Sequence, residues 1–184
     1  MKRSKCLHLV LLGASPLIMT GCNDKPETGF LYRDPLDCQS GGLFKAGLCE
    51  QEYARVLALH RQIAPRYTTQ ADCEADFGSA RCQGVDQVSG AYAPLLSGYL
   101  LGTVPVSATG SQGQRLDWLE QRFPSEPLYQ GLGDDHLRSN CNEYVGRRSG
   151  PLLVSNALTR IRPAPHVQRG GFGLKASALC SQGG

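Results

Sequence analysis

The fold depends most on residues 38–82, which read CQSGGLFKAGLCEQEYARVLALHRQIAPRYTTQADCEADFGSARC. Four cysteines divide this stretch. A bond between Cys38 and Cys49 would close a loop of ten residues, and one between Cys73 and Cys82 a loop of eight. Such short loops keep the paired cysteines within bonding reach, so we expect these two local disulfides.

A helix is predicted between the second and third cysteines, over residues 48–64. Its apolar or aromatic positions recur at helical spacing, and Pro65 would end it. They are Leu48, Tyr53, Val56, Leu57, His60 and Ile63. No second metal-binding residue lies four positions from His60. We therefore interpret His60 as a packed core or boundary residue rather than a metal ligand.

A second, shorter helix is predicted over residues 70–77. Thr69 and Asp72 resemble a capping box at its start, and Gly78 fits the position that follows a helix end. The later part of the chain is rich in glycine and proline. We expect an α+β fold: a small disulfide-stabilised domain, helical in its N-terminal part and loop-rich and partly extended in its C-terminal part.

The N-terminus resembles a bacterial lipoprotein signal. Residues 1–5 are basic, residues 6–19 are uncharged and mostly apolar, and Thr20 and Gly21 lead to Cys22. We predict a signal peptide over 1–21, with Cys22 carrying acyl chains such as palmitate. The alternative, a retained transmembrane anchor, would need about 20 apolar residues. Asn23 favours the periplasmic face of the outer membrane of a Gram-negative bacterium over retention in the inner membrane.

The charge belongs largely to this signal. Without residues 1–21, basic and acidic residues balance, so no nucleic-acid partner is predicted. Residues 22–135 nevertheless carry a net charge of −6 and residues 136–184 one of +6. The basic tail could associate with another copy, contact acidic lipid head groups, dock on its own domain or be merely solvated.

Six cysteines remain once Cys6 is removed with the signal and Cys22 is lipidated. In an oxidising compartment they would form three disulfides, with Cys141 and Cys180 as the third pair. The competing interpretation, structural zinc, is disfavoured because the sequence contains no C-x-x-C or H-x-x-x-H motif. We expect neither a metal nor a cofactor.

The domain is expected to follow a polar tether over residues 22–30 and to span residues 31–184, with a flexible linker near 107–114. Residues 91–106 are the most apolar segment after the signal, and Gly98 and Gly102 would let two helices approach closely. We predict a buried core helix there, with membrane or partner contact as the alternative. Residues 144–154 could form a hairpin.

Several short motifs, in order, resemble the YgiB-like lipoproteins of proteobacteria, a family of unknown function. They are Leu31-Tyr32, Asp37-Cys38, Cys49, Tyr53, Ala64-Pro65-Arg66-Tyr67, Asp72-Cys73, Phe77-Gly78, Cys82-Gln83, Pro94-Leu95, Gly98-Tyr99, Gly102, Pro127-Leu128 and Arg169-Gly170-Gly171-Phe172-Gly173. The resemblance covers nearly the whole chain. It implies an envelope lipoprotein, and a gene neighbourhood that includes an ATP-grasp amide ligase.

No catalytic motif is found in the sequence. Asp134, Asp135 and His136 could form an acid/base cluster, but the glycines before them favour an exposed turn. We therefore expect a non-catalytic binding or scaffolding protein, anchored in the membrane and contacting an envelope protein.

The candidate partner-binding residues are Arg169, Gly170, Gly171, Phe172 and Gly173, which form an extended basic and aromatic segment. The alternative function is that of a modification substrate. In that case an ATP-dependent amide ligase would join an amine to the carboxylate of the Gly183-Gly184 terminus.

Overall fold

The protein is an α+β domain in which helices are combined with mainly antiparallel sheets. The computed structural model describes residues 27–85, 90–104, 120–121, 123–155, 158, 160–162 and 166–167. The elements, in chain order, are β1 (Glu27–Tyr32), α1 (Pro35–Ser40), α2 (Ala46–Ile63), β2 (Arg66–Tyr67), α3 (Gln70–Phe77), β3 (Cys82–Gly84), β4 (Tyr92–Pro94), β5 (Gly98–Leu101), β6 (Thr103–Val104), β7 (Glu120–Gln121), β8 (Glu126–Gln130), β9 (Leu137–Arg138), β10 (Tyr144–Gly146), β11 (Gly150–Val154) and β12 (His166–Val167).

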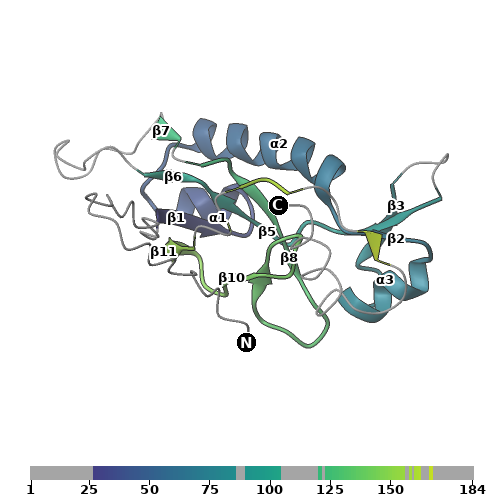
Figure 1. The fold of residues 1–184 in the computed structure, drawn as a ribbon. Coiled ribbons are helices and arrows are strands. Elements are labelled where there is room, and N and C mark those ends of the chain that lie inside the picture. The colour runs from purple at the N-terminus through teal and green to yellow at the C-terminus, as the bar shows by residue number, and fades with distance from the viewer. Residues whose placement is uncertain are drawn as a thin grey trace, which may run out of the picture.

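The main sheet has six antiparallel strands in the order β10-β9-β8-β5-β1-β11. A smaller sheet, β12-β2-β4-β3, lies with α3 at one end of the molecule, and β6 pairs with β7. The long helix α2 crosses above the main sheet and reaches the smaller one (Figure 1). Its C-terminal end therefore lies where the two sheets meet.

The main sheet curls until its two edges approach each other. Only residues 147–149 connect β10 to β11, and this link can span about 14 Å. The same edges of a flat sheet would be about 24 Å apart. A Cβ atom on Gly146 of β10 would lie 3.2 Å from Leu31 Cδ1 of β1 and 3.7 Å from Leu152 Cδ1 of β11. The sheet is therefore a partly closed barrel.

Residues of the main sheet alternate between two cores, as the period of a strand requires. Each of the six strands sends an apolar side chain into the curl: Leu31, Leu100, Leu128, Leu137, Val145 and Val154. The residues between them in β1 and β5 face the helices, where they pack against α1, α2 and Phe44: Phe30, Tyr32, Tyr99 and Leu101. Helix α2 thus covers the outside of the barrel.

A buried polar network also attaches α2 to the sheet. Ser125 Oγ donates to Glu52 Oε2 at 3.0 Å, and the second carboxylate oxygen of Glu52 is 2.7 Å from Arg55 Nη1. The backbone N–H of Gly102 donates to Ser125 Oγ at 3.4 Å. Glu52 is only 2% exposed, so these bonds replace the water that its carboxylate loses on burial.

Helices α2 and α3 lie where the sequence predicts helices, because their signals are local. Pro65 follows the end of α2, and the side chain of Thr69 accepts a hydrogen bond from Asp72 N at the start of α3. Gly78 follows α3 with a φ of +102°, which favours glycine. The N-terminal part is nevertheless mixed, because β1 and β2 accompany these helices.

The two local cysteine pairs are bonded as expected. Cys38 joins Cys49, which ties α1 to α2, and Cys73 joins Cys82, which ties α3 to β3. Cys141 is fully buried. Its predicted partner Cys180 lies outside the described residues.

The prediction of a core helix over residues 91–106 is wrong. The described residues of this segment form strands β4, β5 and β6. The glycines serve strand contacts instead: a Cβ on Gly98 would lie 2.7 Å from Leu137 Cδ1, and one on Gly102 would lie 2.0 Å from Phe123 O. An apolar run that is buried on both faces has the same pattern in a helix and in a central strand.

Three further expectations need correction. The strands over 144–154 exist, but β10 and β11 are opposite edges of the sheet and do not form a hairpin. Strand β1 begins at Glu27, so the tether expected over 22–30 can include at most residues 22–26. The basic region 136–184 is also not a free tail throughout. Its part up to Val154 contains β9, β10 and β11, which belong to the main sheet. The expected linker near 107–114 lies outside the described residues.

Within the part of the chain that the structure describes, no helix is both long and apolar enough to cross a membrane.

Candidate functional site

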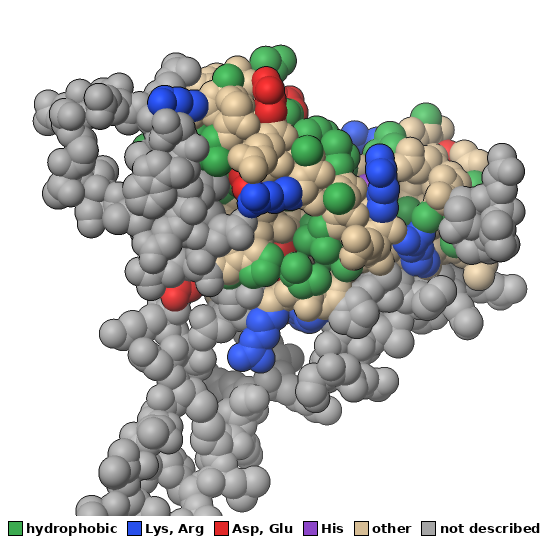
Figure 2. Space-filling view, turned by 90° about the horizontal axis from the view of Figure 1, so that it is seen from above, with side chains coloured by type: hydrophobic (Ala, Val, Ile, Leu, Met, Phe, Trp, Pro, Cys, Tyr) green, Lys and Arg blue, Asp and Glu red, His purple; other side chains and the backbone are tan. Residues whose placement is uncertain are grey.

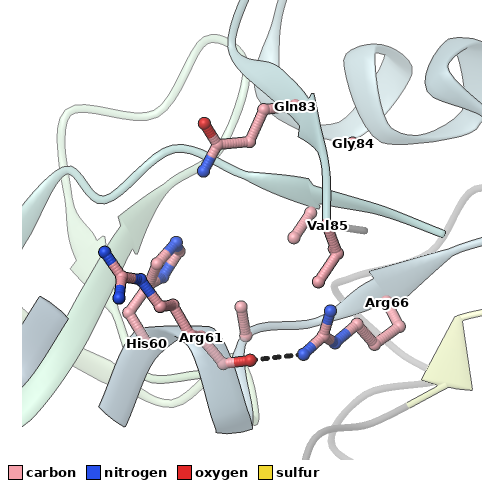
Figure 3. Close-up of a pocket in the computed structure, with 8 residues that line it drawn as sticks. His60, Arg61, Arg66, Gln83, Gly84 and Val85 are labelled. Atoms are coloured by element: carbon pink, nitrogen blue, oxygen red, sulfur yellow. Dashed lines mark hydrogen bonds between the residues drawn. The ribbon is translucent and has the colours of Figure 1, made fainter. Parts of the chain in front are cut away.

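A pocket of about 180 Å³ lies at the C-terminal end of α2, between this helix and the smaller sheet. Its lining comes from α2, β2, β3 and β4. These residues are His60, Arg61, Ala64, Arg66, Gln83, Gly84, Val85 and Ala93. In Figure 3 His60 and Arg61 lie on one side, while Gln83 and Val85 reach in from the opposite side.

His60 is at the base of this arrangement. It lies on the buried face of α2 with Val56 and Ile63, is 5% exposed, and has Nδ1 3.1 Å from the hydroxyl of Tyr129 on β8. Burial, and then the positive charges of Arg66 and Arg61, lower the pKa of His60 to about 4. The ring is therefore neutral at physiological pH. As the sequence suggests, His60 is a core residue, and it also forms part of the pocket wall.

Two arginines give the pocket its charge. Arg66 Nη2 donates to the backbone oxygen of Arg61 at 2.5 Å, which satisfies one of the free carbonyls at the end of α2. No ion pair joins either guanidinium to a carboxylate among the described residues. The lining includes no acidic residue. The pocket is therefore suited to an anionic group.

The opposite wall is braced. Gln83 of β3 is opposite Ala93 of β4 in an antiparallel pair, and Val85 N donates to Ala91 O at 2.8 Å just beyond. The Cys73–Cys82 bond fixes the start of β3 to α3. A wall held in this way loses little conformational entropy when a ligand binds, which favours affinity.

The surface around α2 mixes basic and apolar side chains. Viewed from above, hydrophobic side chains gather between several Lys and Arg side chains, with few acidic ones (Figure 2). Arg55, Ala58 and Arg61 are among the exposed residues of α2. This face therefore offers few carboxylates that could compete for its basic side chains.

The cluster of Asp134, Asp135 and His136 is brought together, as its sequence adjacency implies. His136 Nδ1 is 2.5 Å from Asp134 Oδ1 and 3.0 Å from Asp135 Oδ1. Arg138 pairs with Asp134 at 2.8 Å, and Arg147 with Asp135 at 3.1 Å. Hydrogen bonds from Arg138 and His136 lower the pKa of Asp134 to about 2, outweighing its desolvation. These carboxylates are already neutralised by arginines and form a surface ion-pair network.

Glu126 is a buried acid that belongs neither to the pocket nor to this cluster. Glu126 lies two residues before Leu128 on β8 and is opposite Leu100, so it shares their face of the sheet and points into the barrel. It is 4% exposed, and its Oε1 has no hydrogen-bond partner. Burial raises the pKa of Glu126 to about 8, although the nearby Arg162 opposes the shift. Glu126 is therefore largely protonated at neutral pH.

Sequence reasoning did not single out the pocket. Arg61 and Arg66 flank the predicted end of the first helix, but Gln83 and Ala93 come from distant strands. Only the pairing of β2, β4 and β3 brings them to the same place. No spacing along the chain gives that signal. The residues chosen from the sequence as lipid anchor and partner-binding segment, Cys22 and 169–173, lie outside the described residues.

Residues 26–183 match the model of the family described as "Protein of unknown function (DUF1190)". The chain belongs to this family. Among its curated relatives, a UPF0441 protein of Klebsiella pneumoniae subsp. pneumoniae strain ATCC 700721 / MGH 78578 is 30% identical over 172 residues, covering 85% of this chain and 74% of the relative. A UPF0441 protein of Klebsiella pneumoniae strain 342 gives the same values. No solved structure matches significantly.

The family match and these relatives confirm that the chain belongs to the YgiB-like family, which its ordered motifs resemble. The family description assigns no reaction. Chemistry must therefore be inferred from the residues of the pocket itself.

Proposed function

We propose that this member of the DUF1190 family is an exported, lipid-anchored binding protein that holds an anionic group of an envelope partner at the end of α2. The observation that carries the binding role is the pocket itself. It has two guanidinium groups without carboxylate partners among the described residues, and the wall opposite α2 is braced by a disulfide. Arg61 is exposed and Arg66 is half-buried, so both guanidinium groups can be reached by a ligand, and their charge-assisted hydrogen bonds to an anion would be strong.

Two features support export and anchoring. Disulfides form and persist mainly in oxidising compartments, and the protein has two between buried or half-buried cysteines. The signal-like residues 1–21 precede Cys22, where acyl chains would hold the protein at the periplasmic face of the outer membrane. The pocket would then act without catalysis, as a docking point close to the membrane.

A photo-crosslinking amino acid at Gly84 tests the binding role in living cells. Gly84 lines the pocket, and nothing lies within 4 Å of the position where its Cβ would be. Gly47, in the first turn of α2, is a matched control, because it is equally open and lies about 20 Å away along the helix. We expect an envelope protein to be captured from Gly84 and lost in an Arg66→Gln background. Equal capture from both positions, or none from Gly84, would reject the proposal.

The alternative function concerns the terminus Gly183-Gly184, which lies outside the described residues. Its unhindered carboxylate suits an ATP-dependent amide ligase. The intact mass of the endogenous protein tests this idea. An added amine would support modification, and a plain mass in cells that express the ligase would remove it.

A further inference from the structure

We propose that the pocket binds the C-terminal carboxylate of a peptide that ends in alanine. This inference rests on the proposed binding function and specifies its ligand. The charge of the pocket, its size and apolar wall, and the edge strand β3 beside it each favour this ligand.

The charge selects a carboxylate. Each arginine offers five N–H donors, and the helix cap uses one from Arg66 and none from Arg61. Planar guanidinium groups bind carboxylates through paired hydrogen bonds. His60 is neutral, and in the tautomer whose Nδ1 accepts from Tyr129 its Nε2 carries the proton as a further donor. The Gln83 amide adds another polar group on the opposite side (Figure 3).

The size and the rest of the lining select a small residue. A pocket of about 180 Å³ is smaller than the 300–1,000 Å³ typical of sites for drug-sized molecules and cofactors. Part of its wall is apolar and consists of Ala64, Val85 and Ala93. A methyl group beside the carboxylate would contact this wall, whereas a bare inorganic anion would leave it uncovered.

The edge strand favours a peptide. Strand β3 is the last strand of its sheet, and Gln83 and Gly84 are exposed. An edge strand presents backbone groups to which an extended peptide can pair, and this mode of recognition often combines with capture of a terminal carboxylate. Nothing lies within 4 Å of the position where a Cβ on Gly84 would be, so there is room for another chain beside β3. A peptide lying along β3 would thus direct its last residue into the pocket.

The test titrates the purified mature protein, in detergent, with acetyl-Ala-Ala and follows binding by calorimetry. The matched probe is acetyl-Ala-Ala-amide, which differs in the terminal charge alone. We expect the free carboxylate to bind about ten-fold or more tightly than the amide, because charge-assisted bonds are the strong ones. Inorganic phosphate should compete weakly. Equal binding of the two peptides, or phosphate competing as well as the carboxylate peptide, would overturn the proposal.

Substitutions inside and outside the pocket test where the peptide binds. Arg61→Gln keeps the backbone oxygen that Arg66 caps, so it tests the charge without removing the cap. We expect both Arg61→Gln and Arg66→Gln to weaken peptide binding about ten-fold or more. Arg148→Gln removes an exposed arginine outside the pocket lining and should change affinity less than about two-fold. An equal loss in Arg148→Gln would show non-specific attraction and contradict the proposal. If crosslinking from Gly84 depends on Arg66 but no peptide binds, the ligand is wrong while the binding function stands.

Discussion

At the scale of single residues, two buried titratable groups make the stability of the fold depend on pH, and their effects have opposite signs. His60 is held neutral at the pocket, and Glu126 is held protonated inside the barrel. Both shifts originate mainly in burial, which disfavours the charged form of either group. The pH dependence of stability therefore reports on the burial of both side chains.

We predict that His60 makes the protein less stable as the pH falls from about 6.5 to about 4. In this window the unfolded chain takes up a proton that the folded His60 resists, so protonation favours unfolding. The loss should be about 2 kcal/mol. Urea unfolding at pH 7 and pH 4.5 should show a smaller loss in His60→Gln than in the wild type. Identical losses would mean that the ring is not buried as described.

Glu126 should act with the opposite sign. Its folded pKa of about 8 lies above the unfolded value of 4.5, so it contributes stability that is complete below pH 4.5 and disappears as the pH rises through 8. Between pH 6.5 and 8.5, above most of the His60 window, stability should fall by about 2 kcal/mol from this cause. Glu126→Gln should flatten that fall, which chemical unfolding at the two pH values measures. A fall of the same size in Glu126→Gln would contradict the assignment.

At the scale of elements, Gly102 sets how closely the end of β5 approaches the segment before β8. A Cβ there would lie 2.0 Å from Phe123 O, so the backbone would have to move. We predict that Gly102→Ala costs about 3 kcal/mol or more of stability, as overpacking and a disturbed Ser125 network add together. Gly84→Ala, where the Cβ has open space, is the control and should change thermal unfolding little. Similar stability of the two variants would refute this close approach.

The elements also show what the sequence could predict. Helices α2 and α3 and the two short disulfide loops depend on neighbours in the chain, such as Pro65, Thr69 and Gly78, so local patterns were sufficient. Strands β4 and β5 could not be told from a helix, because their residues are buried on both faces. The curl of the main sheet and the pocket depend on long-range strand order, which no local pattern contains.

At the scale of the whole molecule, the domain is a partly closed barrel covered by α2, with a small sheet at one end and a pocket between that sheet and the end of α2. Strand β1 begins at Glu27, so at most four residues separate the domain from Cys22. Acylation of Cys22 would therefore place the domain directly at the membrane surface.

We predict that Cys22→Ala releases the protein from the membrane fraction or stalls its processing, because no acyl chain would then anchor it. Labelled palmitate should enter the wild type and not the variant. Cys38→Ala is a suitable control, since it removes a cysteine of the Cys38–Cys49 bond and should leave labelling intact. A wild type that never incorporates the label would exclude the lipoprotein assignment.

The most direct test of the binding role is Arg66-dependent photo-crosslinking at Gly84 in living cells. The proposal predicts an envelope adduct from Gly84 that persists in Arg148→Gln and disappears in Arg66→Gln, with no such adduct from Gly47. An adduct that is unchanged in Arg66→Gln, or that appears equally from Gly47, would contradict the assignment of this pocket as the binding site.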